Sequence, residues 1–367
     1  MIDDLRFMAA ALNLARRGLG RVAPNPAVGA LIVKDGAVIG RGVTAPGGRP
    51  HAEVLALREA GDAARGATLY VTLEPCSHHG RTPPCADAII AAGIARVVSA
   101  LEDPDQRVAG QGHARLRAAG IEVEIGVLAD AARRANLGHI LRVTHGRPMV
   151  TLKLAETGDG FATGASGTPR LRITGGAANG RVQMLRALHD AVMIGVDTAL
   201  ADDPRLTVRL PGLEDRKPLR IVLDSHLRLP PSLHLVTTAR GHPTLVITTG
   251  SAPQEAEMAL VAKGVEVVRV KADRVGHVDL AAALGMLGTQ GLTRIFCEGG
   301  PHLAAALIGQ KLAEVVTLFQ SPTRLGQPGL QALDAVSRAA LVDASIYRKG
   351  AQGYAGEDSF SDYERIG

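Results

Sequence analysis

The chain has 367 residues, of which 46% are apolar and 21% are charged, so it can fill two globular cores and is not a disordered protein. Its net charge of +5 comes from dispersed Lys and Arg residues, and aromatic residues make up only 2% of the chain. Because single-strand binders stack bases on aromatic side chains, this composition favours an anionic metabolite over nucleic acid as the partner.

The number of cysteines and the first residues of the sequence indicate the cellular compartment. Cys76, Cys85 and Cys297 are too few, and odd in number, for a disulfide framework. No apolar run reaches the ~18 residues that span a bilayer. Residues 1–5 contain two aspartates and lack the basic-then-apolar order of a signal peptide. We therefore expect a cytoplasmic protein with no membrane partner, and we interpret Cys297 as a buried strand residue.

Helices and strands alternate in the first part of the chain. Apolar residues at three- and four-residue spacing predict a helix over residues 1–17, and Asp35-Gly36 between two apolar runs predicts a hairpin. The other predicted elements are strands at 27–33 and 37–43, a helix at 51–60, a strand at 67–73, a helix at 86–92 and strands at 95–101 and 121–125. This alternation predicts an α/β/α sandwich.

A domain boundary is expected near residues 145–148, so that residues 1–146 form a first domain and residues 147–367 a second. The second part is again α/β. Its predicted strands are 149–154, 191–195, 220–223, 244–248, 265–270 and 294–297, and its predicted helices are 177–188, 253–262, 278–287 and 303–308. The tail from residue 350 onward is polar and glycine-rich and is expected to be extended or mobile.

The strongest chemical pattern lies in the first domain. His51-Ala52-Glu53 is followed by Pro75-Cys76 and, nine positions later, by Cys85. One imidazole and two thiolates suit a catalytic zinc ion, which takes four ligands and keeps one position for water. Glu53 can reach that water without binding the metal if the site lies off the N-terminus of the helix. The pattern is typical of zinc deaminases, in which the glutamate moves the proton.

The spacing alone leaves two other interpretations open. A closed structural zinc site needs a fourth protein ligand, which His78 or His79 could supply. A buried cysteine pair without metal would give the same sequence. In either case the domain could be a binding module in which Glu53 plays no part.

The spacer between Cys76 and Cys85 is eight residues long, whereas the common deaminase pattern is Cys-x-x-Cys. This loop, Cys76-Ser77-His78-His79-Gly80-Arg81-Thr82-Pro83-Pro84-Cys85, together with Asn25-Pro26-x-Val28-Gly29, resembles the bifunctional deaminase/reductase family of riboflavin biosynthesis. The resemblance continues through the second domain. It rests there on Lys153-Leu154-Ala155, Arg186-Ala187, Asp202-Asp203-Pro204-x-Leu206-Thr207-x-Arg209, Leu223-Asp224-Ser225 and Glu298-Gly299-Gly300.

The resemblance implies a cytidine-deaminase-like α/β/α sandwich followed by a dihydrofolate-reductase-like α/β domain. It implies one zinc ion per chain on His51, Cys76 and Cys85, with Glu53 as the catalytic proton carrier. Zinc-activated hydroxide would deaminate 2,5-diamino-6-ribosylamino-4(3H)-pyrimidinone 5′-phosphate, and NADPH would then reduce the ribosyl group to ribityl. Family precedent also allows a homo-oligomer.

Binding roles follow from the same resemblance. The implied substrate-binding residues are Asn25, Arg81, Asp103, Lys153, Arg186, Asp202, Leu206, Arg209 and Glu298. The implied cofactor-binding residues are Ala155, Arg172, Thr198, Ser225, Gly299 and Gly300. A Gly-Gly pair between a strand and a helix lets backbone N–H groups approach a phosphate at the helix N-terminus.

Some positions depart from the family pattern. Thr44 stands where some members carry His, and Asp105 where Asn is common, which concerns the ribose and phosphate contacts of the deaminase. In the second domain the pattern reads Thr157-Gly158-Asp159-Gly160, and Arg170 and Arg172 replace a small hydroxyl residue and a tryptophan. An impaired or altered reductase is therefore an alternative hypothesis, and a tRNA- or nucleoside-type zinc deaminase is another.

Overall fold

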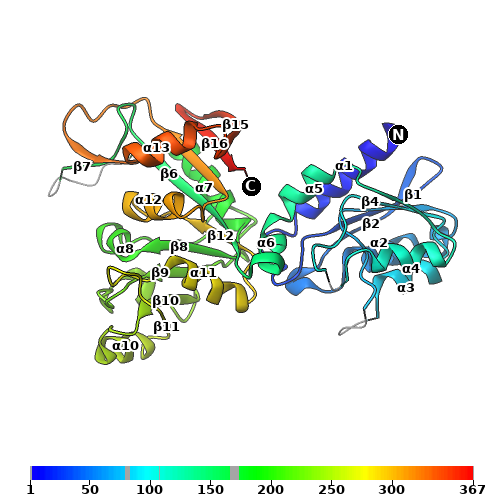
Figure 1. The fold of residues 1–367 in the computed structure, drawn as a ribbon, viewed down its shortest axis with the longest axis horizontal. Coiled ribbons are helices and arrows are strands. Elements are labelled where there is room, and N and C mark those ends of the chain that lie inside the picture. The colour runs from blue at the N-terminus through cyan, green and yellow to red at the C-terminus, as the bar shows by residue number, and fades with distance from the viewer. Residues whose placement is uncertain (1, 79–82, 107, 166–172, 367) are drawn as a thin grey trace. The chain divides into compact units, whose positions relative to one another are not determined.

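The computed structural model describes residues 2–78, 83–106, 108–165 and 173–366. The chain divides into two compact units, Met1–Arg147 and Pro148–Gly367 (Figure 1). Each unit has its own β-sheet and its own apolar core. Among the described residues, none of the helices combines the length and apolarity needed to cross a bilayer.

The first unit is built on a five-stranded sheet in the order β2-β1-β3-β4-β5. β1 runs antiparallel to both β2 and β3, whereas β3, β4 and β5 are parallel to one another. Its strands are β1 (Gly29–Lys34), β2 (Ala37–Val43), β3 (Thr68–Val71), β4 (Arg96–Ser99) and β5 (Glu122–Ile125). Its helices are α1 (Ile2–Arg16), α2 (Ala52–Ala60), α3 (Cys85–Ala91), α4 (Gln111–Ala118), α5 (Ala129–Ala135) and α6 (Leu137–His145).

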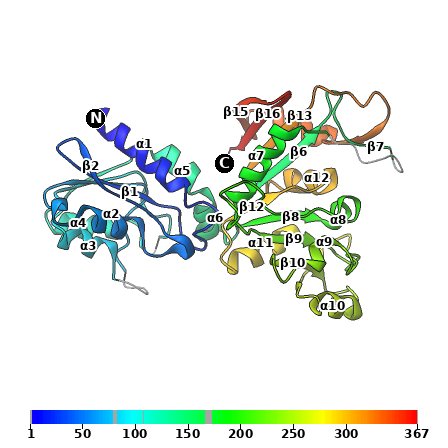
Figure 2. The ribbon, with the colours of Figure 1, turned by 180° about the vertical axis from the view of Figure 1, so that it is seen from behind.

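Helices cover both faces of this sheet (Figures 1 and 2). α1 packs with α5 on one face, while α2, α3 and α4 follow one another on the other. α2 lies directly on β2 because Gly42 has no side chain: a Cβ at Gly42 would come within 1.9 Å of the Ala52 carbonyl oxygen. This close packing fixes the first turn of α2 against the sheet.

The second unit contains a nine-stranded sheet in the order β11-β10-β9-β8-β12-β6-β13-β16-β15 and a small β14-β7 ribbon (Figure 2). Its strands are β6 (Met149–Glu156), β7 (Phe161–Gly164), β8 (Ala191–Gly195), β9 (Leu219–Leu223), β10 (Thr244–Thr249), β11 (Glu266–Val270), β12 (Arg294–Cys297), β13 (Val315–Gln320), β14 (Gly329–Gln331), β15 (Tyr347–Ala355) and β16 (Asp358–Arg365). Its helices are α7 (Gly176–Ala187), α8 (Val196–Asp202), α9 (His234–Thr237), α10 (Gln254–Val261), α11 (Leu280–Thr289), α12 (Pro301–Gly309) and α13 (Ala335–Val342).

The strands from β11 to β13 in this sheet are all parallel. Their apolar runs are buried on both faces, as a parallel sheet covered by helices requires: in β10, Leu245 and Ile247 face one core cluster and Val246 faces the other. Because the strands are parallel, their carboxyl ends meet at one edge of the sheet. Ligands of open α/β sheets bind outside this edge.

The predicted strands and helices are present, with shifts of a few residues at their ends, and the structure adds elements that the pattern did not reveal. α4, α5, α6, α8 and β13 were not anticipated. The tail was expected to be extended or mobile. It is extended, but it is also paired: β16 lies antiparallel to both β13 and β15, so the end of the chain completes the sheet.

Candidate active sites of the two units

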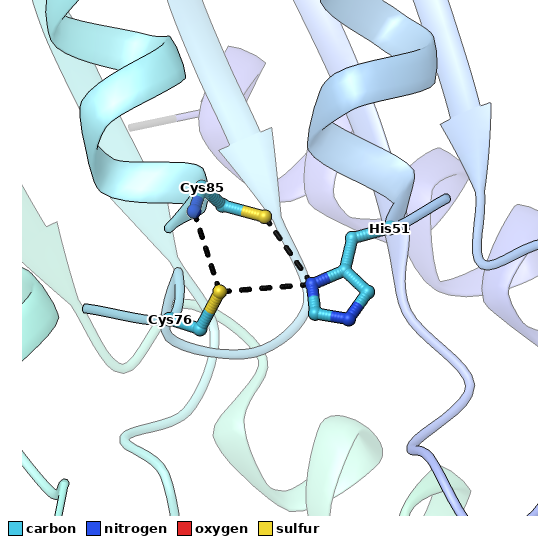
Figure 3. A group of neighbouring side chains, drawn as sticks. All are labelled: His51, Cys76 and Cys85. Atoms are coloured by element: carbon cyan, nitrogen blue, oxygen red, sulfur yellow. Dashed lines mark hydrogen bonds between the residues drawn. The ribbon is translucent and has the colours of Figure 1, made fainter. Parts of the chain in front are cut away.

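Three side chains from separate parts of the first unit converge on one point (Figure 3). His51 immediately precedes α2, Cys85 is the first residue of α3, and Cys76 lies in the loop after β3. Nδ1 of His51 lies 3.3 Å from Sγ of Cys85 and 3.7 Å from Sγ of Cys76. The structure thus brings together the three residues predicted to bind zinc, with all donor atoms within 4.8 Å of one another.

The spacing of these atoms fits a zinc ion. Tetrahedral zinc, with Zn–N bonds of ~2.0 Å and Zn–S bonds of ~2.3 Å, separates a nitrogen and a sulfur ligand by roughly 3.5 Å. The two observed N···S separations, 3.3 and 3.7 Å, lie on either side of that value. Two thiolates would also balance the charge of Zn²⁺. The donor set therefore fits zinc in both geometry and chemistry.

The two cysteines of the cluster differ in the pKa of their thiol groups. The hydrogen bond between the two thiol groups lowers the pKa of Cys76 to about 4 and raises the pKa of Cys85. The backbone N–H of Cys85 also donates to Sγ of Cys76 at 3.3 Å. Cys76 is therefore already a thiolate, the form in which a cysteine binds metal, whereas Cys85 would lose its proton when zinc binds.

Glu53 lies beside the ligand cluster without being part of it. It is in the first turn of α2 and only 3% exposed. Burial raises the pKa of its carboxyl group, against the opposing effect of the nearby His51, and the carboxyl group interacts with the Cys85 thiol. A buried carboxyl group next to three metal ligands is placed to exchange protons at the site.

The described residues give no support to a closed structural zinc site. In this part of the chain, the ligand cluster at His51 contains three residues, and the exposed His78 is not among them. His79 lies outside the described residues. A three-ligand set leaves one coordination position for water, as catalytic zinc requires.

The predicted substrate contacts of the first unit are partly visible. Asn25 and Asp103 are half-buried. Oδ1 of Asp103 accepts a hydrogen bond from the Asp105 N–H at 2.8 Å. Burial raises the pKa of the Asp103 carboxyl group, against the effect of this hydrogen bond and of the nearby His78. Asp103 therefore lies near the loop that follows Cys76. Arg81, the predicted phosphate contact, lies outside the described residues.

Thr44, one of the departures from the family pattern, is used internally. Its side chain is 3% exposed, and its hydroxyl oxygen accepts a hydrogen bond from the Val28 N–H at 3.0 Å. Thr44 therefore joins the strand that follows Asn25 to the loop that precedes His51. It has no charge to offer a phosphate.

A residue that sequence reasoning missed organises the loop beyond β4. Glu74 is 5% exposed, and its two carboxylate oxygens accept four backbone hydrogen bonds. Oε2 receives the N–H groups of Asp103 (3.0 Å) and Gly110 (2.9 Å), and Oε1 those of Gly112 (2.8 Å) and His113 (3.2 Å). Glu74 thereby ties the segment before Cys76 to the segment that carries Asp103. Its only sequence signal is an acidic residue between an apolar strand and Pro-Cys.

Glu74 also lies close to Glu102 and His113, and the three together form a second cluster of side chains of the kinds that bind metal ions. The four backbone N–H groups already use the lone pairs of its carboxylate. Glu74 therefore joins two segments of the chain rather than binding a metal ion. We call this carboxylate with its four backbone hydrogen bonds the Glu74 clasp.

In the second unit, most predicted residues gather at the carboxyl edge of the parallel strands. Glu298, Gly299 and Gly300 join β12 to α12, whose N-terminus they form, and a Cβ at Gly300 would lie 3.4 Å from Oγ1 of Thr198. The other members of this set are Lys153 and Ala155 on β6, Thr198 on α8 and Ser225 after β9. Five strands and helices that are distant in sequence thus contribute to one edge, where α/β sheets bind ligands.

The loop after α8 carries three further predicted substrate contacts. Asp202 ends α8 and is half-buried. The Leu206 side chain is 2% exposed and belongs to the core, and its backbone has a φ of 52°. Arg209 is exposed; its backbone N–H donates to Gln183, and its Nη1 donates to the Thr207 hydroxyl at 3.1 Å. Of the three, Leu206 is the one that belongs to the apolar core.

The altered segment after β6 keeps an ordered turn. The Thr157 hydroxyl donates to Oδ1 of Asp159 at 2.5 Å, and Asp159 in turn accepts the N–H groups of Leu325 and Gly326, both at 3.0 Å. Thr157 thus keeps a hydroxyl in this turn. Arg170 and Arg172 lie outside the described residues.

Comparison with known proteins identifies both units. Residues 1–101 match the family model of the cytidine and deoxycytidylate deaminase zinc-binding region, and residues 148–351 match that of the RibD C-terminal domain. Riboflavin biosynthesis protein RibD of Escherichia coli is 41% identical over 354 residues, covering 90% of this chain and 93% of that protein.

Solved structures agree over the full length. Acinetobacter baumannii RibD superposes with a TM-score of 0.87 at 36% identity, covering 100% of this chain and 99% of that one. A diaminohydroxyphosphoribosylaminopyrimidine deaminase/5-amino-6-(5-phosphoribosylamino)uracil reductase from Thermotoga maritima gives a TM-score of 0.84 at 33% identity, covering 99% of each chain.

These matches confirm the expected fold classes, a cytidine-deaminase-type domain followed by an α/β reductase domain. The first domain matches a zinc-binding region, and the His51, Cys76 and Cys85 cluster of the structure lies within it and fits zinc; NADPH is the cofactor of the second domain. The chain therefore belongs to the RibD family of riboflavin biosynthesis proteins, bifunctional enzymes with deaminase and reductase domains.

Proposed function

We propose that the first unit deaminates 2,5-diamino-6-ribosylamino-4(3H)-pyrimidinone 5′-phosphate and that the second unit reduces the ribosyl group of the product to ribityl with NADPH. The observation that carries the proposal is the convergence of His51, Cys76 and Cys85 beside the buried Glu53, in a chain whose second unit matches the RibD C-terminal domain. The Thermotoga maritima relative is described as a deaminase and reductase of these compounds.

In the deaminase, His51, Cys76 and Cys85 would hold zinc, which supplies Lewis-acid activation of a water molecule. Glu53 moves two protons in turn: it takes one from the attacking water and passes it to a ring nitrogen of the pyrimidine. It then takes the proton of the hydroxyl group that has added to the ring carbon and gives it to the exocyclic amine, so that the C–N bond breaks, ammonia leaves and a carbonyl group forms. The raised pKa of the buried Glu53 suits a group that both accepts and donates protons. Asn25 would bind the edge of the pyrimidine and hold its reacting carbon in place.

In the reductase, NADPH supplies the hydride that reduces C1′ of the ribosylamine. The residues of the chain align the nicotinamide with the substrate. The Gly299–Gly300 turn, Thr198, Ser225 and Ala155 would line the cofactor, and the cations Arg186 and Arg209 would bind the phosphorylated substrate together with Lys153 and Asp202. Arg81 and Arg172 complete the proposed set, as a phosphate contact in the first unit and a cofactor contact in the second.

We assign deamination to residues 1–146 and reduction to residues 147–367, a division supported by the two compact units. The proposed partner is the phosphorylated pyrimidine and not nucleic acid. None of Cys76, Cys85 and Cys297 is in a disulfide, which supports the reducing cytoplasm as the compartment.

The test is a coupled assay on the full-length, zinc-loaded protein: ammonia release from the diaminopyrimidine phosphate, then NADPH oxidation with the deaminated compound. Glu53→Ala should retain zinc, abolish ammonia release and leave NADPH oxidation intact. Glu59→Ala, which alters an exposed glutamate of the same helix, is the control and should retain both activities. Unchanged ammonia release by Glu53→Ala would contradict the deaminase assignment, and no NADPH oxidation by the unaltered chain would contradict the reductase assignment.

A further inference from the structure

The loop that leads into the zinc ligand His51 is joined to the loop that carries Asn25. The Gly47 N–H donates to the Arg21 carbonyl oxygen at 2.8 Å, and the Asn25 N–H donates to the Val22 carbonyl oxygen at 2.9 Å. The first bond holds the two loops together, and the second fixes the turn that carries Asn25. The residues between the loops must therefore fit the space that the backbone leaves.

Gly48 occupies that space and faces the Asn25 side chain. A Cβ built on Gly48 would lie 1.8 Å from Nδ2, 2.5 Å from Cγ and 2.9 Å from Cβ of Asn25. Rotating the Asn25 side chain would move its amide group but not its Cβ, because that atom is fixed to the backbone. Any side chain at Gly48 would therefore displace Asn25 itself or separate the two loops.

The neighbouring Gly47 also has a positive φ, but no atom lies where its Cβ would stand. Gly47 has a φ of 75° and Gly48 a φ of 88°, so both occupy the left-handed region that favours glycine. A Cβ on Gly47 would meet no atom within 4 Å. The two glycines thus share a positive φ but differ in what surrounds them.

We propose that Gly48 is a positioning residue of the deaminase, which keeps open the space in which the Asn25 amide is held for binding the pyrimidine edge. This inference rests on the proposed function, in which Asn25 touches the substrate. Hydrogen bonds to a base edge depend on placement to within a fraction of an ångström, and a misplacement of about 1 Å can cost ~100-fold in rate. A methyl group at position 48 is enough to cause such a shift.

The experiment compares Gly48→Ala with Gly47→Ala in the full-length, zinc-loaded protein. Gly48→Ala should lower kcat/KM for ammonia release by at least ~10-fold, mainly through a higher KM, because the lost contact binds substrate and transition state alike. Gly47→Ala also places an alanine at positive φ, but without the clash, and should stay within ~2-fold of the unaltered protein. Zinc content, measured by elemental analysis, should be unchanged in both.

A double-mutant cycle separates positioning from general damage. In an Asn25→Gly background the side chain that obstructs the new methyl group is gone. Asn25→Gly alone should lower kcat/KM, and adding Gly48→Ala should lower it further by less than ~3-fold. If Gly48→Ala does not fold, the double variant should fold again, since the clash has been removed.

Three results would overturn the proposal: wild-type kinetics in Gly48→Ala, an equal loss from Gly48→Ala with and without the Asn25 side chain, or a double variant that still does not fold. A failure of the proposed function looks different. In that case Asn25→Gly itself would leave ammonia release unchanged, or the unaltered protein would release none.

Discussion

Arg186 and Glu298 hold each other in a two-point ion pair, with Nε–Oε1 and Nη2–Oε2 distances of 2.5 and 2.9 Å. Arg186 belongs to α7, and Glu298 follows β12. Their side chains are only 10% and 13% exposed. The third nitrogen, Nη1, donates to the Thr207 carbonyl oxygen at 3.0 Å. Glu298, predicted as a substrate contact, therefore orients the guanidinium of Arg186 at the carboxyl edge of the sheet.

Replacing Glu298 by glutamine should impair the reductase alone. Arg186 would lose its two-point partner and keep a buried charge close to Arg209, so its orientation would no longer be fixed. We expect NADPH oxidation to fall at least ~10-fold in kcat/KM while ammonia release stays within ~2-fold, with both activities measured on one preparation. The control is Asp197→Asn, which breaks the exposed Arg228–Asp197 pair and should change neither activity. Equal losses of both activities would contradict this role of Glu298.

Removing a zinc ligand should abolish the deaminase activity and leave the reductase activity intact. Cys85→Ser lacks a thiolate, so elemental analysis should show less than one zinc ion per chain and ammonia release should be lost, while NADPH oxidation with the deaminated compound continues. Cys297→Ala removes a buried thiol of the second unit and should retain the zinc. Full zinc content in Cys85→Ser would show that Cys85 does not bind the metal.

The Glu74 clasp should contribute strongly to the stability of the first unit. Glutamine at this position can accept from at most two of the four backbone N–H groups, and its own NH₂ group would point at the others. Glu74→Gln should therefore lower the free energy of unfolding by about 3 kcal/mol, measured by urea denaturation. Glu102→Gln, at the exposed glutamate of the same group, should change it by less than ~0.5 kcal/mol. Equal stability of the two variants would show that the four hydrogen bonds contribute little.

The zinc site was predictable because its chemistry fixes residue types at readable spacings. His51, Cys76 and Cys85 could be singled out without a fold, and the alternation of helices and strands predicted the architecture around them. The eight-residue spacer then distinguished this family from other zinc deaminases. The structure brought the ligands together and placed Glu53 beside them, as the pattern indicated.

What the sequence did not reveal are roles that depend on long-range contacts. Glu74 reads as one acidic residue among many, and only the folded chain shows four N–H groups around it. Gly48 reads as a turn residue until its distance to Asn25 is measured. Leu206 stands in a polar stretch of sequence, and only the folded chain shows its side chain in the core. Partners that are far apart in sequence carry no local signal.

His189 should make the second unit sensitive to acid. Its ring is 2% exposed, with Nε2 2.9 Å from the Thr151 hydroxyl oxygen and Nδ1 2.6 Å from the Leu185 carbonyl oxygen. Burial lowers the pKa of His189 to about 3, whereas an unfolded histidine titrates near ~6.5. Above the unfolded value both states are neutral and pH has no effect. Below it, the unfolded chain binds the proton first, so stability falls as the pH drops toward 3.

The expected loss from His189 between pH 7 and pH 5 is about 2 kcal/mol in the free energy of unfolding. Urea denaturation followed by tyrosine fluorescence can measure it, because Tyr347, Tyr354 and Tyr363 lie in the second unit and Tyr70 alone in the first. His189→Gln should flatten this pH dependence, whatever its effect on stability at pH 7, because glutamine does not titrate. The exposed His277→Gln should leave the slope as it is. An unchanged slope in His189→Gln would mean that the proton is taken up elsewhere when the unit unfolds.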